Sequence, residues 1–146
     1  MKRFSLALGI AIFSLSVFAS EVPSLEPALI YAARHNLLPL AAQMIARGVS
    51  VNERDLMGNT PLHHAVRHPG MVKFLLENGA DVNARNLLGE TALHLSVRHK
   101  QTVEHLLAGG ADKTIRTIIG RTVVDYCVFG YPRRKTLEVL MLLYSE

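Results

Sequence analysis

Cysteine, tryptophan and known catalytic motifs are what this sequence has least of. Its 146 residues contain one cysteine, Cys127, and no tryptophan. A single cysteine excludes an intrachain disulfide, so the fold needs a packed core of its own. The sequence has no G-x-S-x-G, no phosphate-cradling glycine loop, no H-E-x-x-H and no carboxylate pair on a common helix face. We therefore expect no enzymatic activity and no cofactor.

A long apolar run occurs at the amino terminus. Lys2 and Arg3 precede an apolar segment from Phe4 to Phe18, and Ala19 follows it. This order is typical of a secretory signal peptide, residues 1–19, that is cleaved after Ala19. The alternative is a retained anchor that tethers a scaffold to the membrane. An apolar segment of 15 residues is shorter than the ~20 that a spanning helix needs.

Export changes what the charge of the chain implies. The whole chain has a formal net charge of +4, and cleavage removes Lys2 and Arg3. The remaining charge, close to neutral, does not indicate a nucleic-acid partner. The single cysteine and the lack of an Asn-x-Ser/Thr glycosylation acceptor favour a bacterial periplasm over a eukaryotic secretory route. We expect a periplasmic protein that does not remain inserted in the membrane.

Two consecutive segments, 55–85 and 86–116, repeat each other without a gap. They are identical at 15 of 31 aligned positions. A match of this size in one register does not arise from composition, so the chain is a stack of one supersecondary unit. We expect a short linker at 20–25, then a domain at 26–146 whose repeats are 26–54, 55–85, 86–116 and 117–146. Atypical terminal repeats are usual in a stack, because their outer faces meet water.

The repeated unit resembles the ankyrin repeat. Residues 60–65 read T-P-L-H-H-A, which fits the family pattern T-P-L-H-x-A, and residues 75–83 read L-L-E-N-G-A-D-V-N. In the second copy, Ala92 and Ser96 replace Pro61 and Ala65. The resemblance implies an all-α repeat solenoid, a stack of about four helix pairs with finger hairpins. It also implies that the protein binds another protein.

Capping and turn residues mark the helices within each unit. Thr60 and Thr91 stand where a helix begins, and their hydroxyls suit the first-turn amides. Gly79 and Gly110 suit the positive φ that ends the second helix. Both copies are two residues shorter than the usual ~33 of the family. We place the resulting tight turn between the two helices at residues 69–70.

Seven histidines raise the alternative of a periplasmic metal- or haem-handling protein. His64 and His68 are four residues apart and could present two imidazoles on one helix. However, His63 and His94 recur in repeat register, as His68 and His99 do. The resemblance assigns the first pair to hydrogen bonds between neighbouring repeats. The spacing indicates no third ligand, so we expect no metal site.

Cys127 is a candidate nucleophile only if a histidine lies beside it. It occupies the register position of Ala65 and Ser96, a small site between helices where a lone thiol behaves as a hydrophobe. We therefore expect Cys127 to be buried and unreactive.

The main candidate binding surface lies at the tips of the predicted hairpins. The two residues before each hairpin glycine are apolar in three copies, and an arginine shortly before them recurs every 31 residues. Stacking would align them into an apolar row edged by arginine, a composition typical of protein-binding surfaces. The alternative is that each apolar pair folds inward over its own hairpin. The predicted residues are Arg54, Leu56, Met57, Arg85, Leu87, Leu88, Arg116, Ile118 and Ile119.

A second row of candidate residues is expected on the inner helices of the same concave side. These positions differ between the copies, which suits an asymmetric partner, although the arginines could be ordinary solvated charges. Phe129 also opens an insertion that extends to Lys135. This insertion could grip an acidic partner or lipid head groups, or it could be a tolerated surface loop. The predicted residues are His64, Arg67, Leu95, Arg98, Tyr126 and Phe129.

Together these features predict a non-catalytic periplasmic module that is monomeric on its own. It would act by stoichiometric association with another protein. Small exported bacterial proteins of this kind resemble immunity factors, which neutralise a toxin by covering its site, or accessory factors of envelope enzymes. The residues leave both roles open.

Overall fold

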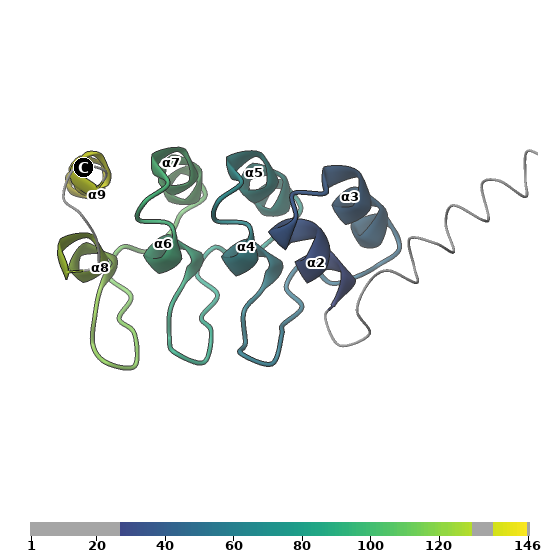
Figure 1. Ribbon diagram of the computed structural model, residues 1–146, viewed down its shortest axis with the longest axis horizontal. Helices are drawn as coiled ribbons and strands as arrows, with labels where there is room; N and C mark the ends of the chain where they lie inside the picture. Colours follow the sequence, from purple (N-terminus) through teal and green to yellow (C-terminus); the bar gives the residue numbers. More distant parts are fainter. Residues whose placement is uncertain (1–26, 130–135, 146) are drawn as a thin grey trace, which may run out of the picture.

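Helix pairs standing side by side make up the molecule (Figure 1). The computed structural model describes residues 27–129 and 136–145. The predicted signal peptide, the linker and residues 130–135 of the insertion lie outside these ranges. Within them no residue is assigned to a strand. The helix pairs form one line and their hairpin fingers project from the same side, so the fold is the predicted all-α repeat solenoid.

Each pair combines an inner helix, next to the fingers, with an outer helix. Inner helices pack against inner helices and outer against outer along the central and C-terminal part of the stack. The inner helices are α2 (Ala28–Arg34), α4 (Pro61–His64), α6 (Ala92–Leu95) and α8 (Val123–Phe129). The outer helices are α3 (Leu38–Ala46), α5 (Pro69–Glu77), α7 (Lys100–Ala108) and α9 (Thr136–Tyr144).

The inner helices of the two central repeats are shorter than those of the terminal repeats. Helices α4 and α6 have four residues each, whereas α2 and α8 have seven. The predicted position of the tight turn, residues 69–70, is wrong. Pro69 is the first residue of α5, and the chain turns over residues 65–68. Proline lacks an N–H and suits the first turn of a helix, while the residue before it, His68, is forced into a non-helical conformation.

Thr60 begins α4, as predicted, through a capping box with His63. The backbone N–H and the hydroxyl of Thr60 both donate to Nδ1 of His63, at 3.1 and 2.9 Å. Thr91 and His94 repeat this arrangement at 3.2 and 2.9 Å at the start of α6. The imidazole thus takes the place of the Glu or Gln side chain of the usual capping box.

Apolar side chains at helical spacing form a continuous core between the pairs. Leu62 in α4 is 1% exposed, and Leu106 in α7 is fully buried. Ala65, Ser96 and Cys127 are all buried, which confirms the small site predicted at this register position. Gly79 and Gly110 follow the ends of α5 and α7 with φ of +86°, also as predicted.

Candidate protein-interaction surface

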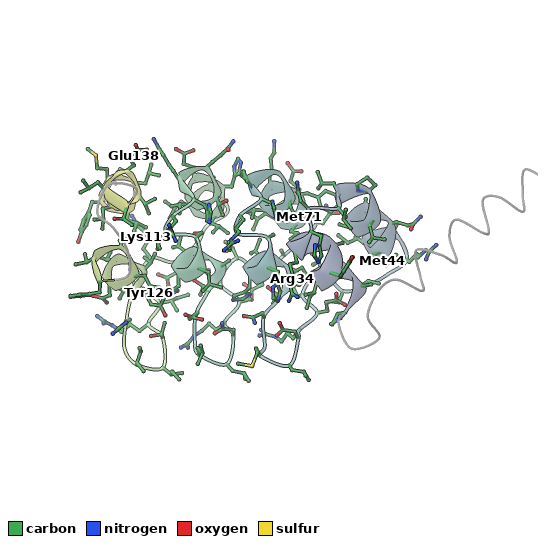
Figure 2. The ribbon with its side chains drawn as sticks, viewed as in Figure 1. Arg34, Met44, Met71, Lys113, Tyr126 and Glu138 are labelled. Atoms are coloured by element: carbon green, nitrogen blue, oxygen red, sulfur yellow. The ribbon has the colours of Figure 1, made fainter. Side chains whose placement is uncertain are left out.

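Six apolar side chains at the finger tips are exposed to solvent. Their exposed fractions range from 46% for Leu88 to 91% for Leu56. Figure 2 shows the side chains at the tips of the fingers, which point away from the helices. The alternative in which each pair folds inward is therefore wrong. We call this set the finger-tip ribbon: Leu56, Met57, Leu87, Leu88, Ile118 and Ile119.

A polar side chain at the base of each central finger holds the tip in place. Oδ1 of Asp55 accepts hydrogen bonds from the N–H groups of Met57 and Asn59, at 2.9 and 2.8 Å. In the next finger, Oδ1 of Asn86 accepts the two equivalent N–H groups at 3.0 and 2.9 Å. These side-chain hydrogen bonds satisfy the backbone N–H groups of the turn. The finger tip therefore keeps its shape while its apolar side chains lie in solvent.

Backbone hydrogen bonds join neighbouring fingers at their tips. The N–H of Leu87 donates to the carbonyl of Met57, and the N–H of Ile118 donates to that of Leu88, both at 3.0 Å. Gly89 permits this approach, because a Cβ at that position would lie 3.0 Å from the backbone nitrogen of Ile118. The ribbon is therefore aligned before any partner arrives, and a partner need not order it.

The arginines beside the ribbon bond to backbone carbonyls. Arg54 donates to the carbonyl of Gly58 in its own finger at 2.9 Å and to that of Arg85 in the next finger at 2.7 Å. Arg85 repeats the pattern one unit further on, at 3.3 and 2.8 Å. Arg116 donates to the carbonyl of Gly120 at 2.8 Å. These arginine hydrogen bonds are not predicted above, although the constant four-residue spacing from arginine to glycine is a signal for them.

The predicted inner-helix row differs in exposure from residue to residue. Arg67, Arg98 and Phe129 are exposed, and Leu95 is half-buried. His64 and Tyr126 are half-buried and take part in hydrogen bonds between repeats. Contact between any of these residues and a partner stays a prediction.

His64 links the first two repeats. Its Nδ1 lies 3.3 Å from Nη2 of Arg34 in α2, and its Nε2 lies 2.8 Å from Oδ2 of Asp55. The same carboxylate oxygen accepts a hydrogen bond from Nδ2 of Asn59 at 3.2 Å. Burial alone would raise the pKa of Asp55, but the hydrogen bonds from His64, Asn59 and the backbone outweigh it, so that its pKa lies below the usual value.

The same chain of hydrogen bonds continues to the last repeat. Nδ2 of Asn86 donates to Oδ1 of Asn59 and to Oε2 of Glu90, both at 3.0 Å. The hydroxyl of Tyr126 donates to Oε1 of Glu90 at 2.7 Å. Burial, with the bond to Glu90 adding to it, raises the pKa of Tyr126 to about 12. We call this series from Arg34 to Tyr126 the inner polar chain, and it crosses all four repeats.

Of the first register pair, His63 bonds to the neighbouring repeat as the resemblance implied, but His94 does not, because its Nε2 is buried without a hydrogen-bond partner. Nε2 of His63 donates to the carbonyl of Glu90 at 3.1 Å, because its Nδ1 is occupied as an acceptor from Thr60. His68 places its Nε2 3.2 Å from the carbonyl of Arg34. Burial lowers the pKa of His63, which keeps its ring neutral. Burial also lowers the pKa of His94.

The candidate metal ligands and the Cys127 thiol can be compared with their surroundings in the structure. In the ranges 27–129 and 136–145, no three His, Cys, Asp or Glu side chains gather as a metal site would require. Burial raises the pKa of Cys127 to about 11, so its thiol stays protonated near neutral pH. No helix in the described part of the chain is long and apolar enough to cross a membrane.

Comparisons with known proteins agree with this repeat geometry. A family model described as ankyrin repeats (3 copies) matches residues 17–86, and a model of the single ankyrin repeat matches residues 88–118. The chain is also 42% identical over 55 residues to protein FPV233 of Fowlpox virus (strain NVSL), which is named as an ankyrin repeat protein. That match covers 36% of this chain and 11% of the viral protein.

Proposed function

Because this chain belongs to the ankyrin-repeat family, we propose that it is a non-catalytic module that binds another protein stoichiometrically through its finger-tip ribbon. The observation that carries the proposal is the exposure of six apolar side chains in one backbone-bonded row. Soluble domains rarely expose aligned apolar residues without a use for them. Arg54, Arg85 and Arg116, which are themselves exposed, form a polar rim of the kind that surrounds protein interfaces.

The chemistry of the rim indicates the kind of partner. Each rim guanidinium uses part of its donors on finger carbonyls, and an arginine has five N–H donors in all. The donors left over suit carboxylates on a partner. Arg67 and Arg98 on the inner side are exposed as well. We propose a partner surface with apolar side chains between acidic ones.

We further propose that the protein acts in a bacterial periplasm, either as an immunity factor that covers a toxin or as an accessory factor of an envelope enzyme. The proposal rests on the signal-peptide pattern of residues 1–19. Mass spectrometry of the mature N-terminus checks export, because cleavage after Ala19 leaves a chain that begins at Ser20. Deleting the gene separates the two roles: sensitivity to sister cells favours immunity, and sensitivity to oxidants favours protection of an enzyme.

A triple substitution tests the binding surface. We expect Leu56→Ser with Leu87→Ser and Ile118→Ser to leave the circular dichroism spectrum and the Tm unchanged, because all three side chains are exposed. We expect the principal protein captured from a native envelope extract to be lost. The matched control is Gln101→Ser with Glu104→Ser on the exposed side of α7, which should retain it. Capture by the triple variant at the level of the unchanged protein would contradict the proposal.

A further inference from the structure

The finger-tip ribbon repeats at a regular interval along the stack, and two features set that interval. The outer helices of the central repeats, α5 and α7, pack against each other, and packed helices lie about 8–10 Å apart. At the tips, one residue step of about 3.8 Å and one hydrogen bond of 3.0 Å separate a residue from its equivalent in the next finger. With the covalent bonds on either side, this path spans at most about 11 Å. Successive fingers therefore lie about 8–11 Å apart.

An α-helix matches this interval once every seven residues. Seven residues rise about 10.5 Å and make nearly two full turns, so the side chain returns to the same face within about 20°. Six and eight residues rise about 9 and about 12 Å, but they rotate the side chain roughly 120° and 80° away from that face. A helix with an apolar side chain at every seventh position therefore presents one of them to each finger.

Extended backbones fit the ribbon less well. A β-strand covers the interval with three residues, about 10 Å, but a step of three residues places the side chain on the opposite face. A polyproline II segment returns to the same face every three residues, about 9.3 Å, but it gives each finger one side chain. Each finger tip offers two exposed apolar side chains. One heptad of a helix also supplies two, at its a and d positions.

Positive charge repeats along the ribbon at the same interval. Arg54 makes both of its bonds to finger carbonyls through Nη1, so Nη2 of this exposed side chain takes no part in them. The acidic residues on either side of it are engaged elsewhere. Glu53 accepts hydrogen bonds from two N–H groups of α2, and Asp55 accepts four from its own finger and from α4. Arg85 and Arg116 recur at the same register, so one acidic side chain per heptad would meet one guanidinium per finger.

We infer that the finger-tip ribbon accepts an amphipathic α-helix of the partner, laid along the row with one heptad on each finger. The helix carries apolar residues at its a and d positions and an acidic residue beside them, over about three heptads, roughly 32 Å. This inference rests on the proposed function and adds the kind of segment that the ribbon binds. Backbone bonds between the fingers fix the interval before the helix arrives, so docking costs little ordering on this side.

A synthetic peptide of about 21 residues, three heptads, tests the helix. It carries leucine at positions a and d and glutamate at e and g, where repulsion between like charges also keeps two peptides from pairing. The fluorescence anisotropy of the labelled peptide should show saturable binding to the full chain with a Kd of about 1–100 µM, because the interface is small. The triple variant Leu56→Ser, Leu87→Ser and Ile118→Ser should bind it roughly tenfold more weakly or worse. The control Gln101→Ser with Glu104→Ser should bind it normally.

Comparison peptides separate the possible periods. The first keeps the composition but repeats its apolar pair every nine residues or so, which places successive pairs on opposite faces of a helix. The second alternates leucine and glutamate as a strand does, and the third has leucine at every third position of a proline-rich chain. In a fourth, lysine replaces the glutamates, and repulsion from the rim arginines should weaken binding by roughly tenfold. Binding of any of the four as tight as that of the heptad peptide would overturn the inference.

Photo-cross-linking tests the match of one heptad to one finger. A benzophenone group in the middle heptad should attach to the finger of Leu87 and Leu88. The same group in the first or the last heptad should attach to the finger on one side or the other, and mass spectrometry of the digested product locates each site. Cross-links from every heptad to every finger would mean that the helix has no fixed register, which also overturns the inference.

Failure of the helix and failure of the proposed function give different results. If the heptad peptide does not bind at about 1 mM while the triple variant still loses its captured partner, the ribbon binds a protein through another kind of segment. That result overturns the helix alone. If the triple variant keeps its captured partner, the proposed function is wrong and the helix falls with it.

Discussion

The two central repeats and the last described repeat are built on one plan, but no further repeat follows the last one within the described residues. Arg54 and Arg85 each bond to their own finger and to the next one. Arg116 bonds to the carbonyl of Gly120 in its own finger, and the described part of the chain holds no finger beyond it. The outer helices α5 and α7 are covered by the helix that follows, whereas α9 exposes an apolar stripe. Each central repeat therefore gains hydrogen bonds and packing contacts from the repeat that follows it.

The start of the inner helix differs between these regions as well. His63 and His94 form the capping box of the central repeats. Asp125 occupies the same register position in the last repeat and accepts hydrogen bonds from the N–H and the hydroxyl of Thr122, at 2.8 and 2.9 Å. An imidazole can also donate to the next repeat, as His63 does to Glu90. An ionised carboxylate only accepts, so Asp125 caps its own helix without a donor for another repeat.

Truncating a core side chain should have the largest effect on the free energy of unfolding. The effect should differ between α7, which a neighbouring helix covers, and α9, which exposes an apolar stripe. Leu106 in α7 is fully buried, and Leu137 in α9 is 57% exposed. We expect Leu106→Ala to lower the free energy of unfolding by about 2–5 kcal/mol. Leu137→Ala should change it by less than about 0.5 kcal/mol, as surface substitutions do. Urea denaturation of both variants checks this, and equal losses would contradict it.

Replacing a finger glycine by alanine should have an intermediate effect on stability. Gly89 and Gly120 both have positive φ, +72° and +77°. A Cβ on Gly89 would lie 2.7 Å from Nη2 of Arg85 and 3.0 Å from the nitrogen of Ile118, whereas one on Gly120 would meet nothing within 4 Å. Gly120→Ala should cost about 1–2 kcal/mol through backbone strain alone. Gly89→Ala should cost more, because the next finger must also move.

The difference in stability between these two alanine variants measures the contact between fingers. Thermal unfolding of both, side by side, supplies it. A Gly120→Ala variant as unstable as Gly89→Ala would show that the φ angle accounts for the whole effect and that neighbouring fingers are not in tight contact.

The smallest effect expected is a pH dependence that differs between the two kinds of cap. Burial lowers the pKa of His63 in the folded protein, so below about pH 6.5 the unfolded chain binds a proton that the folded one does not. The stability should fall as the pH is lowered from 7.5 to 5.5, roughly the window in which an unfolded histidine titrates. His63→Gln should reduce this pH dependence, and the remainder should come from His94, whose pKa burial also lowers.

The Asp125 carboxyl titrates in a lower pH range than a histidine does. Hydrogen bonds from the backbone and side chain of Thr122 lower its pKa, so its contribution is complete above the usual carboxyl pKa and is lost as the pH falls through the lowered folded value. Asp125→Asn should therefore leave the pH 5.5–7.5 profile (about the histidine window) unchanged. Urea unfolding across pH 3–8, roughly the span of both groups, checks both variants. A profile altered by Asp125→Asn near neutral pH would contradict the assignment.

Much of the fold could be predicted from the sequence, because its signals are local and repeated. Thr60 as the start of a helix and Gly79 as the end of one are recognisable from residue type and spacing alone. The apolar pairs at the finger tips could be located for the same reason. The turn within the unit could not be placed correctly from the sequence. Proline occurs both in turns and at helix starts, so residues 69–70 fit either a turn or the beginning of a helix.

The sequence by itself determined the repeat, its register and the apolar character of the finger tips, because these depend on residues within one 31-residue unit. Only the tertiary structure decided which polar side chains are used in hydrogen bonds between repeats. Tyr126 bonds to Glu90, which lies 36 residues before it, and Asn86 bonds to Asn59, 27 residues before it. Such bonds join different repeats, so they depend on how one unit stacks on the next. The same stacking decides that α9, at the end of the row, leaves its apolar stripe uncovered.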